Sequence, residues 1–445
     1  MHQMPHAKTM RPQIPWILAS LLLTGLLLAP AARTQEAARM APLPPSQPPA
    51  KVLTWDDCVA LAAQQNPNLV SAQYAEKAGR ASYLGSFNGL LPTLSLSDSY
   101  SSSNGSAGKP GYSAQGSASV NLFNMGQVAS IRSASASYSQ SQASLRQVSA
   151  NLRFNLRSAF TQAFIAEKNV EVARKILEIR QRNAEEVTLK YQSGKEYKGN
   201  MLNARAQFLQ SQASLAQALR NMRTSRRALD QQLGLDDFSE VAVTGTLVAQ
   251  TPPDFPANMA DFISARPDVL LQETAIKAQQ AAVASAQSPL WPNLSASYTR
   301  SRSGPYEFPD PNYGWSAGAT LSYPIFGGGP TSTYFAVKSA KSNLGKSLQD
   351  LRAVRDAAIV DLENNWAAYA NAVDQLRVQE ANLESARQRN AEAEVRYASG
   401  LLSFDNWEVI VGEWVSAEQA ALQAQSSAVT AQAAWEKSLG KALGE

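Results

Sequence analysis

Few residues of this chain could perform catalysis. Its histidines, His2 and His6, precede an uncharged stretch from Ile14 to Ala29 that has the pattern of a cleaved secretory signal. Without that segment the chain has no histidine and a single cysteine, Cys58. This composition excludes Ser-His-Asp and Cys-His catalysis, histidine-based metal sites and an internal disulfide. We therefore predict a protein that is not an enzyme and that needs no cofactor or metal.

The N-terminal segment resembles a signal peptide more than a membrane anchor. Lys8 and Arg11 precede the apolar stretch, and a run of small residues ends it. The stretch is shorter than the ~20 residues that a spanning helix needs. We predict a signal peptide over residues 1–32 and a flexible, proline-rich leader over residues 33–53. Cys58 lies in a predicted helix start, too far from this signal to be a lipoprotein cysteine, and is expected to be buried.

Other function classes also lack their signatures. The triplet Gly327-Gly328-Gly329 precedes a predicted helix but lacks the strand-loop context of a nucleotide site, so we interpret it as a turn. The formal net charge is +4, and residues of both signs are mixed along the chain. A nucleic-acid-binding surface would instead show a cluster of basic residues. No second apolar run is long enough for a membrane helix, so if the chain enters a membrane it does so as strands.

The chain is a tandem duplication. Five landmarks recur in the same order, with a spacing that drifts from 200 residues (Pro92 to Pro292) to 206 residues (Gly194 to Gly400). We predict a first repeat over residues 54–240, a linker over 241–264, a second repeat over 265–440 and a short tail over 441–445. The paired landmarks are Asn66-Pro67 with Arg266-Pro267, Leu91-Pro92 with Trp291-Pro292, Phe123 with Phe326, Tyr191 to Gly194 with Tyr397 to Gly400, and Leu233-Gly234 with Leu439-Gly440.

Each repeat has the same predicted elements. A helix of about 25 residues runs up to Leu91 or Trp291, and two strands with alternating polarity follow it. The loops inside these hairpins, residues 101–111 and 303–313, are rich in Gly, Ser, Pro and Asn. A proline-free helical tract of nearly 70 residues comes next and would extend about 100 Å. A helix of about 40 residues then returns, which favours a coiled coil or a helical tube over a compact domain.

The strands suggest a shared barrel. Four strands per chain cannot close in lipid, where a barrel needs at least about eight. Two chains would give eight strands and a filled interior, whereas three would give twelve and a lumen. Four aromatic residues are predicted to lie at the membrane interfaces, with packing in a soluble sheet as the alternative. These residues are Tyr100, Tyr298, Trp315 and Tyr323.

From about Trp55 to Gly440, the duplicated landmarks make the chain similar to the TolC family of outer-membrane efflux proteins. The resemblance implies an α+β membrane protein, a homotrimer whose twelve-stranded β-barrel continues into a periplasmic α-helical tunnel. It also implies an outer-membrane location and a function as an export duct. The implied partners are a periplasmic adaptor and an inner-membrane ABC or proton-driven pump. A secreted structural or filament protein is the alternative, which the signal peptide and the duplicated hairpins disfavour.

By the same resemblance, Gly194 and Gly400 mark two periplasmic helix tips, beside Tyr191 and Tyr397. The first tip is basic and the second acidic. We hypothesise that ion pairs between the tips hold the tunnel closed, and exposed pairs of this kind contribute about 0.2–1 kcal/mol each. Ordinary solvated charge is the alternative. The charged residues are Lys190, Lys195 and Lys198 in the first tip, and Asp405 and Glu408 in the second.

The second tip departs from the family pattern. Leu402 stands where the family's gate has an arginine, and Asn406 occupies one expected carboxylate position. The tip is instead unusually apolar. We favour an adaptor-docking surface there over packing between the tip helices. The docking candidates are Leu401, Leu402, Phe404 and Trp407.

Overall fold

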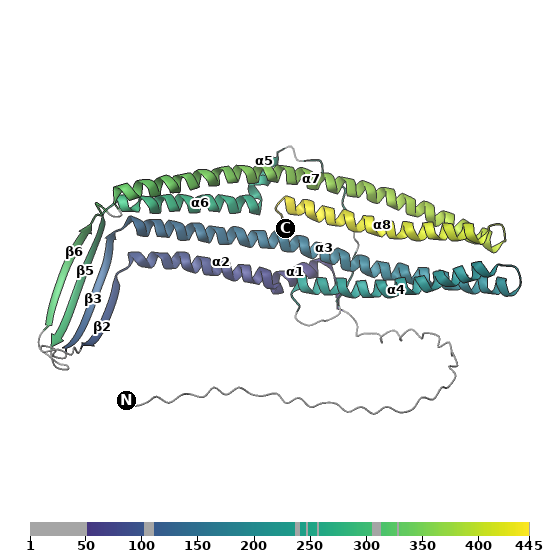
Figure 1. The fold of residues 1–445 in the computed structure, drawn as a ribbon, viewed down its shortest axis with the longest axis horizontal. Coiled ribbons are helices and arrows are strands. Elements are labelled where there is room, and N and C mark those ends of the chain that lie inside the picture. Colours follow the sequence, from purple (N-terminus) through teal and green to yellow (C-terminus); the bar gives the residue numbers. More distant parts are fainter. Residues whose placement is uncertain are drawn as a thin grey trace, which may run out of the picture. The chain divides into compact units, whose positions relative to one another are not determined.

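The computed structural model describes residues 51–101, 111–235, 241–245, 248–255, 258–304, 313–326 and 329–444. The predicted signal peptide, nearly all of the leader, both hairpin loops and the first two glycines of the glycine triplet lie outside these ranges. Within them the chain is mostly helical with a small sheet (Figure 1).

The two repeats contain the same elements in the same order, as the duplicated landmarks predict. In the first repeat the main elements are α1 Trp55–Gln65, α2 Pro67–Gly85, β2 Thr93–Ser101, β3 Gly111–Phe123, α3 Met125–Gln192 and α4 Lys198–Leu233. In the second they are α5 Met259–Ala265, α6 Pro267–Gln287, β5 Asn293–Gly304, β6 Tyr313–Ser322, α7 Pro330–Ala398 and α8 Phe404–Ser438. Short 3₁₀ turns, Ser86–Leu90 and Ser288–Leu290, connect α2 to β2 and α6 to β5.

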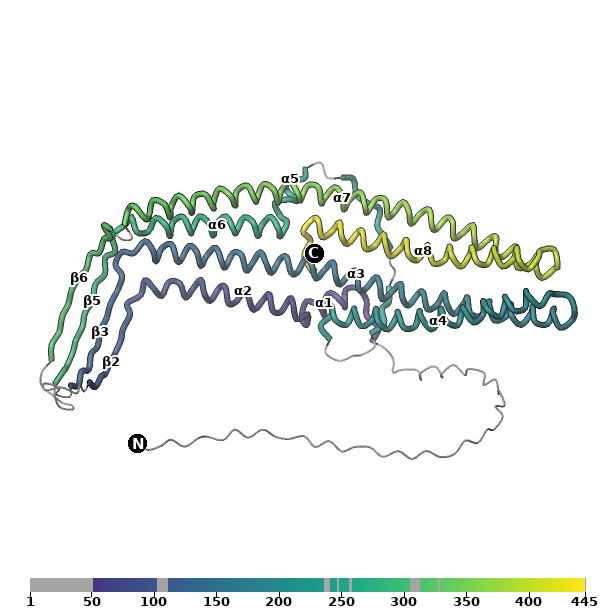
Figure 2. The backbone as a smooth tube through the Cα atoms, viewed as in Figure 1, coloured from purple at the N-terminus to yellow at the C-terminus, as the bar shows by residue number. Residues whose placement is uncertain are grey.

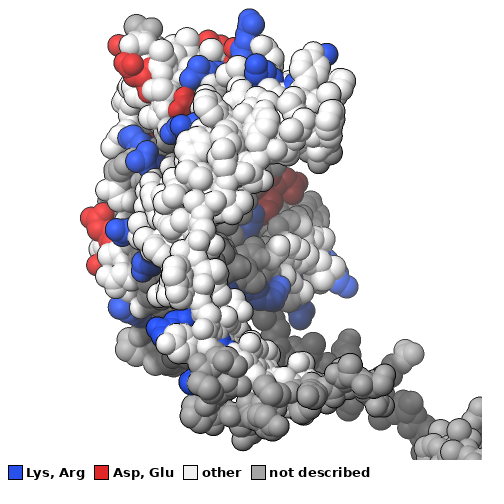
Figure 3. All heavy atoms as spheres, turned by 90° about the vertical axis from the view of Figure 1, so that its left-hand side faces the viewer, with Lys and Arg blue, Asp and Glu red and all other residues white. Residues whose placement is uncertain are grey.

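The sheet is antiparallel in the order β2-β3-β5-β6, so among the described strands β2 and β6 each have one unpaired edge. Its register separates two kinds of face. On one face, Leu94 is opposite Ala118, and Leu294 is opposite Leu321. On the other face, hydroxyl side chains pair across strands, as Ser95 Oγ does with Ser117 Oγ at 2.6 Å. Figure 3 looks onto the sheet end of the molecule, where uncharged residues dominate the visible surface.

The long helices extend away from the sheet as two helical hairpins that lie side by side (Figure 2). Helix α3 has 68 residues and α7 has 69, which confirms the predicted tracts. Near the sheet α3 packs on α2 and α6, and towards the far end it packs on α4 and α8. Buried alanines recur at seven-residue intervals on α3 near the sheet. Their small side chains allow the neighbouring helices to approach α3 closely. These alanines are Ala129, Ala136, Ala143 and Ala150.

A small parallel sheet joins the start of the first repeat to the predicted linker. Strand β1, Lys51–Leu53, pairs with β4, Val241–Val243, and Leu53 and Val241 are buried in the central core. The predicted leader and the predicted linker therefore both contain regular structure. The last three residues of the predicted flexible leader form a strand, and the linker contains β4 and most of α5. Neither pairing partner has a periodic pattern long enough to reveal a three-residue strand.

The end of each returning helix is anchored to the kink before α2 or α6. In the first repeat, Asn66 Oδ1 accepts hydrogen bonds from the backbone N–H groups of Asn68 and Leu69 at 3.0 and 3.1 Å. This amide therefore caps α2. Asn66 Nδ2 also donates to the carbonyl of Gln232 at 2.8 Å. One side chain thus starts a helix and holds the end of α4 against it.

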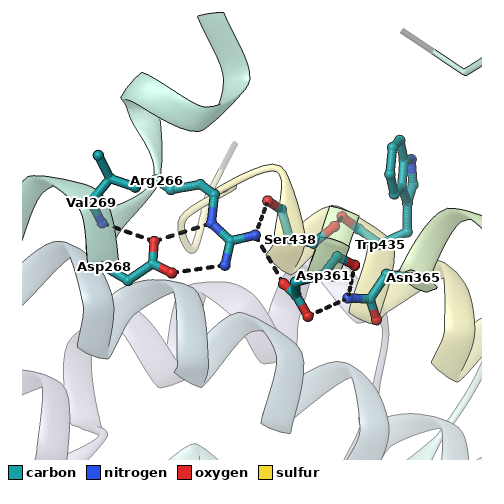
Figure 4. A network of polar contacts seen from close by, with 7 residues as sticks. All are labelled: Arg266, Asp268, Val269, Asp361, Asn365, Trp435 and Ser438. Carbon is teal, nitrogen blue, oxygen red and sulfur yellow. Dashed lines mark hydrogen bonds and ion pairs between the residues drawn. The ribbon is translucent and has the colours of Figure 1, made fainter. Parts of the chain in front are cut away.

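Arg266 takes this position in the second repeat (Figure 4). Its guanidinium donates to the Ser438 carbonyl at 3.1 Å and forms ion pairs with Asp268 at 2.8 Å and Asp361 at 2.9 Å. Burial would raise the pKa of Asp268, but the Arg266 contacts outweigh it and lower that pKa. The end of α8 is therefore held by charge where the end of α4 is held by an amide.

Among the described residues, no helix combines the length and the apolar character needed to cross a membrane.

Candidate gate at the helix tips

The turns of the two helical hairpins have the same backbone geometry. Gly194 has φ of 74° and Gly400 has φ of 75°, a left-handed conformation that glycine adopts without a Cβ clash. The N–H of Gly194 donates to the Tyr191 carbonyl at 3.0 Å, and that of Lys195 donates to the Lys190 carbonyl at 2.8 Å. This pair of bonds is a Schellman motif, which ends a helix at glycine. The second turn repeats both bonds, from Gly400 and Leu401 to Tyr397 and Arg396.

A buried aromatic cluster fills the space between the two tips. Tyr397 and Trp407 stack with ring centroids 5.0 Å apart and an interplanar angle of 20°. Val187 from α3 and Ala204 from α4 are buried in the same cluster. We call this set, together with Phe404, the tip cluster. It packs apolar residues of both hairpins together at the end farthest from the sheet.

The tip cluster changes the interpretation of the predicted docking residues. Phe404 and Trp407 are only 3% and 6% exposed within one chain, so they pack between the tip helices and were wrong as surface candidates. Leu402 is partly buried against the same cluster. Leu401 is 79% exposed and is the only one of the four that presents a large free apolar surface. Periodicity could not separate these residues, because the deciding neighbours come from α3 and α4.

One buried ion pair connects the two hairpins near the tips. Arg180 Nη1 of α3 lies 2.6 Å from Glu408 Oε2 of α8, with side chains 8% and 16% exposed. Glu408 was predicted as a tip residue, but its arginine partner was missed because Arg180 precedes the turn by several helical turns. Within the described part of one chain, Lys195, Lys198 and Asp405 form no ion pair. Ion pairing between the two tips through these residues stays a prediction.

Lys190 forms a second connection between the hairpins. Its ammonium lies 2.7 Å from Glu186 Oε1 on the same helix and 3.9 Å from the ring centroid of Tyr397 on α7. Burial would lower the pKa of Lys190, but Glu186 and Tyr397 outweigh this effect and raise it. Burial also raises the pKa of the Tyr397 phenol. The lysine is therefore charged at neutral pH and stabilised over the aromatic ring.

An open groove of about 680 Å³ runs between α3, α4 and α8, on the sheet side of the tips. Its lining is dominated by amide and hydroxyl side chains, such as Gln207, Gln210 and Ser214 of α4 and Gln419 of α8. Arg180 is the only charged residue among the described residues that line it, and its guanidinium is paired with Glu408. The groove is thus polar but nearly uncharged.

Three of the predicted interfacial aromatics lie on the apolar face of the sheet, but not all of them at strand ends. Tyr100 and Trp315 lie near the hairpin loops, and Trp315 is 71% exposed. Tyr323 follows the last residue of β6 at the helical end. Tyr298 lies in the middle of β5, opposite Ala317, so its predicted position at a strand end was wrong. The alternation of apolar and polar residues correctly indicated which face of the sheet these side chains occupy. Their position along each strand could be determined only from the register of the strands.

Comparison with known proteins agrees with this architecture. The profile of the family described as "Outer membrane efflux protein" matches residues 58–235 and 260–441, which is most of the chain and follows the two repeats. The chain therefore belongs to the outer membrane efflux protein family. Comparison with curated proteins finds none whose sequence matches this chain.

Solved structures show the same fold at low sequence identity. The CmeC outer membrane channel of Campylobacter jejuni is similar with a TM-score of 0.77 and 18% identity, over 88% of this chain and 86% of that one. The open state of the MtrE outer membrane channel of Neisseria gonorrhoeae has a TM-score of 0.73 and 20% identity, over 87% and 88%. The outer membrane protein VceC of Vibrio cholerae has a TM-score of 0.72 and 16% identity, over 87% and 96%.

Proposed function

We propose that three copies of this chain form an export duct of the outer membrane, with a shared twelve-stranded barrel and a helical tunnel in the periplasm. The observation that carries the proposal is the open sheet. Within the described part of the chain, both of its edges, β2 and β6, lack a partner, and unpaired edges cannot be left open in lipid. Edge pairing between three chains would satisfy them and leave a lumen.

The two faces of the sheet support this arrangement. Its apolar face exposes Leu94, Leu96, Trp315 and Leu321, a composition that suits contact with lipid. Its other face carries serine, threonine and glycine, such as Ser117 opposite Thr299, and suits a water-filled interior. Because the described part of that face carries no ionised side chain, we expect a barrel lumen with little intrinsic charge selectivity.

The tips are the proposed gate. Within each chain the tip cluster, the Arg180–Glu408 pair and the Lys190–Tyr397 contact hold the two hairpins together. Separating them would leave a buried carboxylate and a guanidinium without their partner, which is costly. A closed entrance is therefore the resting state that we propose for the isolated duct.

The proposed partners are a periplasmic adaptor and, through it, an inner-membrane pump of the ABC or proton-driven class. Membership of the efflux family supports this, because a duct of this kind has no energy source of its own. The exposed Leu401 and the groove between α3, α4 and α8 are the surfaces that we propose for adaptor contact. A cysteine placed at Leu401 should crosslink to the adaptor. One placed at the exposed Val360, on the same long hairpin but away from the tip, serves as the control.

Two measurements test the duct. We expect heat-resistant trimers in outer-membrane extracts and discrete channels when the purified protein is added to planar lipid bilayers. Recovery of the mature chain as a soluble secreted filament, without channel activity, would contradict the proposal and support the structural alternative.

A further inference from the structure

The two hairpins of the sheet pair with each other inside one chain, and this junction is informative about the free edges. β3 of the first repeat pairs with β5 of the second, from Tyr112 opposite Gly304 to Phe123 opposite Leu294. β2 and β6 are the outer strands of the same sheet (Figure 1). In the duplication β6 is the counterpart of β3, and β2 is the counterpart of β5. The two free edges therefore belong to the same two kinds of strand that meet inside the chain.

Counterpart strands of the two repeats are related by constant spacings. Thr93 is opposite Ser119 in the first hairpin, and Asn293 is opposite Ser322 in the second. β5 thus follows β2 by 200 residues, and β6 follows β3 by 203 residues. The proline landmarks before β2 and β5 and the phenylalanine landmarks after the hairpins have the same two spacings. The sequence and the strand register therefore give the same correspondence between hairpins.

These spacings carry the internal register over to the free edges. Inside the chain, Ser119 of β3 is opposite Ser297 of β5. The counterparts of these two residues are Ser322 on β6 and Ser97 on β2. All four side chains lie on the polar face of the sheet. Pairing of the free edges in this register would place hydroxyl opposite hydroxyl between two chains, as the internal junction does within one chain.

Other registers would break the equivalence of the two junctions. A shift by one residue would bring the polar side chains of β2 to the apolar face of β6. A shift by two residues would keep the faces but move one chain by about 7 Å along the strand. The helices would move with the strands, because only a short 3₁₀ turn separates α2 from β2. The contact of α7 with α2 of another chain would then differ from the internal contact of α3 with α6.

The helices next to the sheet support a repeated junction. α6 packs on α3 and on α7, whereas α2 packs mainly on α3. On α6, Thr274 and Ala281 are 6% and 3% exposed. The residues 200 positions earlier on α2 are Tyr74, which is 65% exposed, and Ala81, which is also exposed. Positions that are covered on α6 are thus open on α2 in a single chain, where α7 of another chain would cover them.

We propose that β6 pairs with β2 of the next subunit in the register of the internal β3–β5 junction. Ser322 then lies opposite Ser97 of the next subunit, and Thr320 lies opposite its Ser99. The junctions between repeats and between subunits alternate around the barrel with the same strand register. This inference rests on the proposed function, because it specifies the contact through which the chains close a barrel.

The test uses pairs of cysteines on the polar face of the full mature chain. Directly opposite residues have Cα atoms about 4.5–5.5 Å apart, which suits a disulfide, whereas residues shifted by two positions are about 7–8 Å apart. Within one chain β2 and β6 are roughly 14 Å apart along the sheet, so a disulfide between them must join two chains. The matched variant is Ser97→Cys/Ser322→Cys, the two shifted variants are Ser95→Cys/Ser322→Cys and Ser99→Cys/Ser322→Cys, and the internal control is Ser119→Cys/Ser297→Cys.

Each variant is purified in detergent, oxidised briefly with copper phenanthroline and analysed by denaturing electrophoresis without reductant. The internal control should form its disulfide within one chain, without covalent multimers. The matched variant should form covalent dimers and trimers to the same extent as the control forms its internal bond. The shifted variants should form at least about tenfold less, because their cysteines lie outside the range of an unstrained disulfide.

Two results would overturn the inference. One is stronger crosslinking of a shifted variant than of the matched variant, and the other is a matched variant that forms heat-resistant trimers but no covalent multimers. In both cases the duct would stand and only the register would fail. A reduced protein that forms neither heat-resistant trimers nor channels in planar bilayers would count against the duct as well.

Discussion

The two helical hairpins share a sequence but use it differently. The hexapeptide Arg-Gln-Arg-Asn-Ala-Glu occurs at residues 180–185 of α3 and again at 387–392 of α7. In the first copy, Arg180 reaches across to Glu408 of the other hairpin and is nearly buried. In the second copy, Arg387 pairs with Glu418 inside its own hairpin at 3.0 Å and is half exposed. The two copies are one residue out of phase, because Arg180 lies 14 residues before Gly194 and Arg387 lies 13 residues before Gly400. The same residues therefore meet different neighbours, and only Arg180 links the two hairpins.

The tips differ in the same way. Both turns end in glycine with nearly identical φ values, but the second supplies the aromatic residues of the tip cluster. Trp407 lies seven residues after Gly400, and the matching position after Gly194 is Met201, which packs only partly against the cluster. The second hairpin therefore contributes the large aromatic side chains of the cluster, and the first contributes the smaller residues that they pack against. Matched substitutions at equivalent positions should separate shared architecture from this specialisation.

The largest difference is expected at Trp407 and Met201. Trp407→Ala removes a buried indole from the tip cluster and should destabilise the tip by about 3–5 kcal/mol, whereas Met201→Ala should cost about 1–2 kcal/mol. Hydrogen exchange of the tip backbone amides in the trimer measures both. Equal protection losses would mean that the cluster is not the main contact between hairpins. Exchange in the sheet should stay unchanged, because it lies at the other end of the helices.

The next difference concerns the repeated arginine. Arg180→Ala leaves the Glu408 carboxylate largely buried without a partner, and should destabilise the closed tip by about 3 kcal/mol. Arg387→Ala removes a more exposed pair and should cost less than about 1 kcal/mol. We expect the first variant to raise the open fraction in single-channel recordings and the second to leave it near that of the original chain. A larger effect of Arg387→Ala would contradict the assignment of the link between the hairpins to Arg180.

The two turn glycines, by contrast, should respond equally to substitution, because their backbone geometry is the same in both repeats. Gly194→Ala and Gly400→Ala each force a Cβ into the left-handed region, which costs about 1–2 kcal/mol. No atom outside the immediate turn lies within 4 Å of a Cβ at either position, so the effect should be conformational and equal. Thermal unfolding of the two variants measures it. A difference well above 1 kcal/mol would indicate that one turn is held by contacts between subunits.

Sequence reasoning succeeded where a local pattern decides the structure. Glycine at a helix end, proline after a helix and alternating strand residues act over a few positions, so the turns, hairpins and long helices could be predicted. It failed where partners are distant in the chain. Arg180 and Glu408 are separated by 228 positions, and the burial of Phe404 depends on α3 and α4. The short strands β1 and β4 were missed for the same reason, since each is stable only against the other and the central core.

The smallest effects of a single substitution are expected at two equivalent acids before the glycines that end α4 and α8. Asp230 precedes Gly234 and Glu436 precedes Gly440 by the same four positions. Burial raises the pKa of Asp230, because Arg227 and Arg226 compensate only partly. Burial would also raise the pKa of Glu436, but its ion pair with Arg153 at 2.9 Å outweighs this and lowers it. The two repeats thus respond to acid with opposite sign.

The sign follows from proton linkage. Glu436 stabilises the fold above the pKa of the unfolded chain, and this contribution is lost as pH falls through its lower folded pKa. Asp230 has the opposite effect, because burial makes its ionised form unfavourable in the folded protein near neutral pH. As pH falls, protonation of its carboxylate removes this destabilising contribution. At pH 7 we expect Glu436→Gln to destabilise the protein and Asp230→Asn to stabilise it, each by about 0.5–1.5 kcal/mol. Thermal unfolding at pH 7 and below pH 4 measures both, and the two effects should shrink together in acid. Destabilisation by Asp230→Asn at neutral pH would mean that its carboxylate gains a cationic partner from a neighbouring subunit. Asp230 and Glu436 would then both stabilise the protein in their ionised forms.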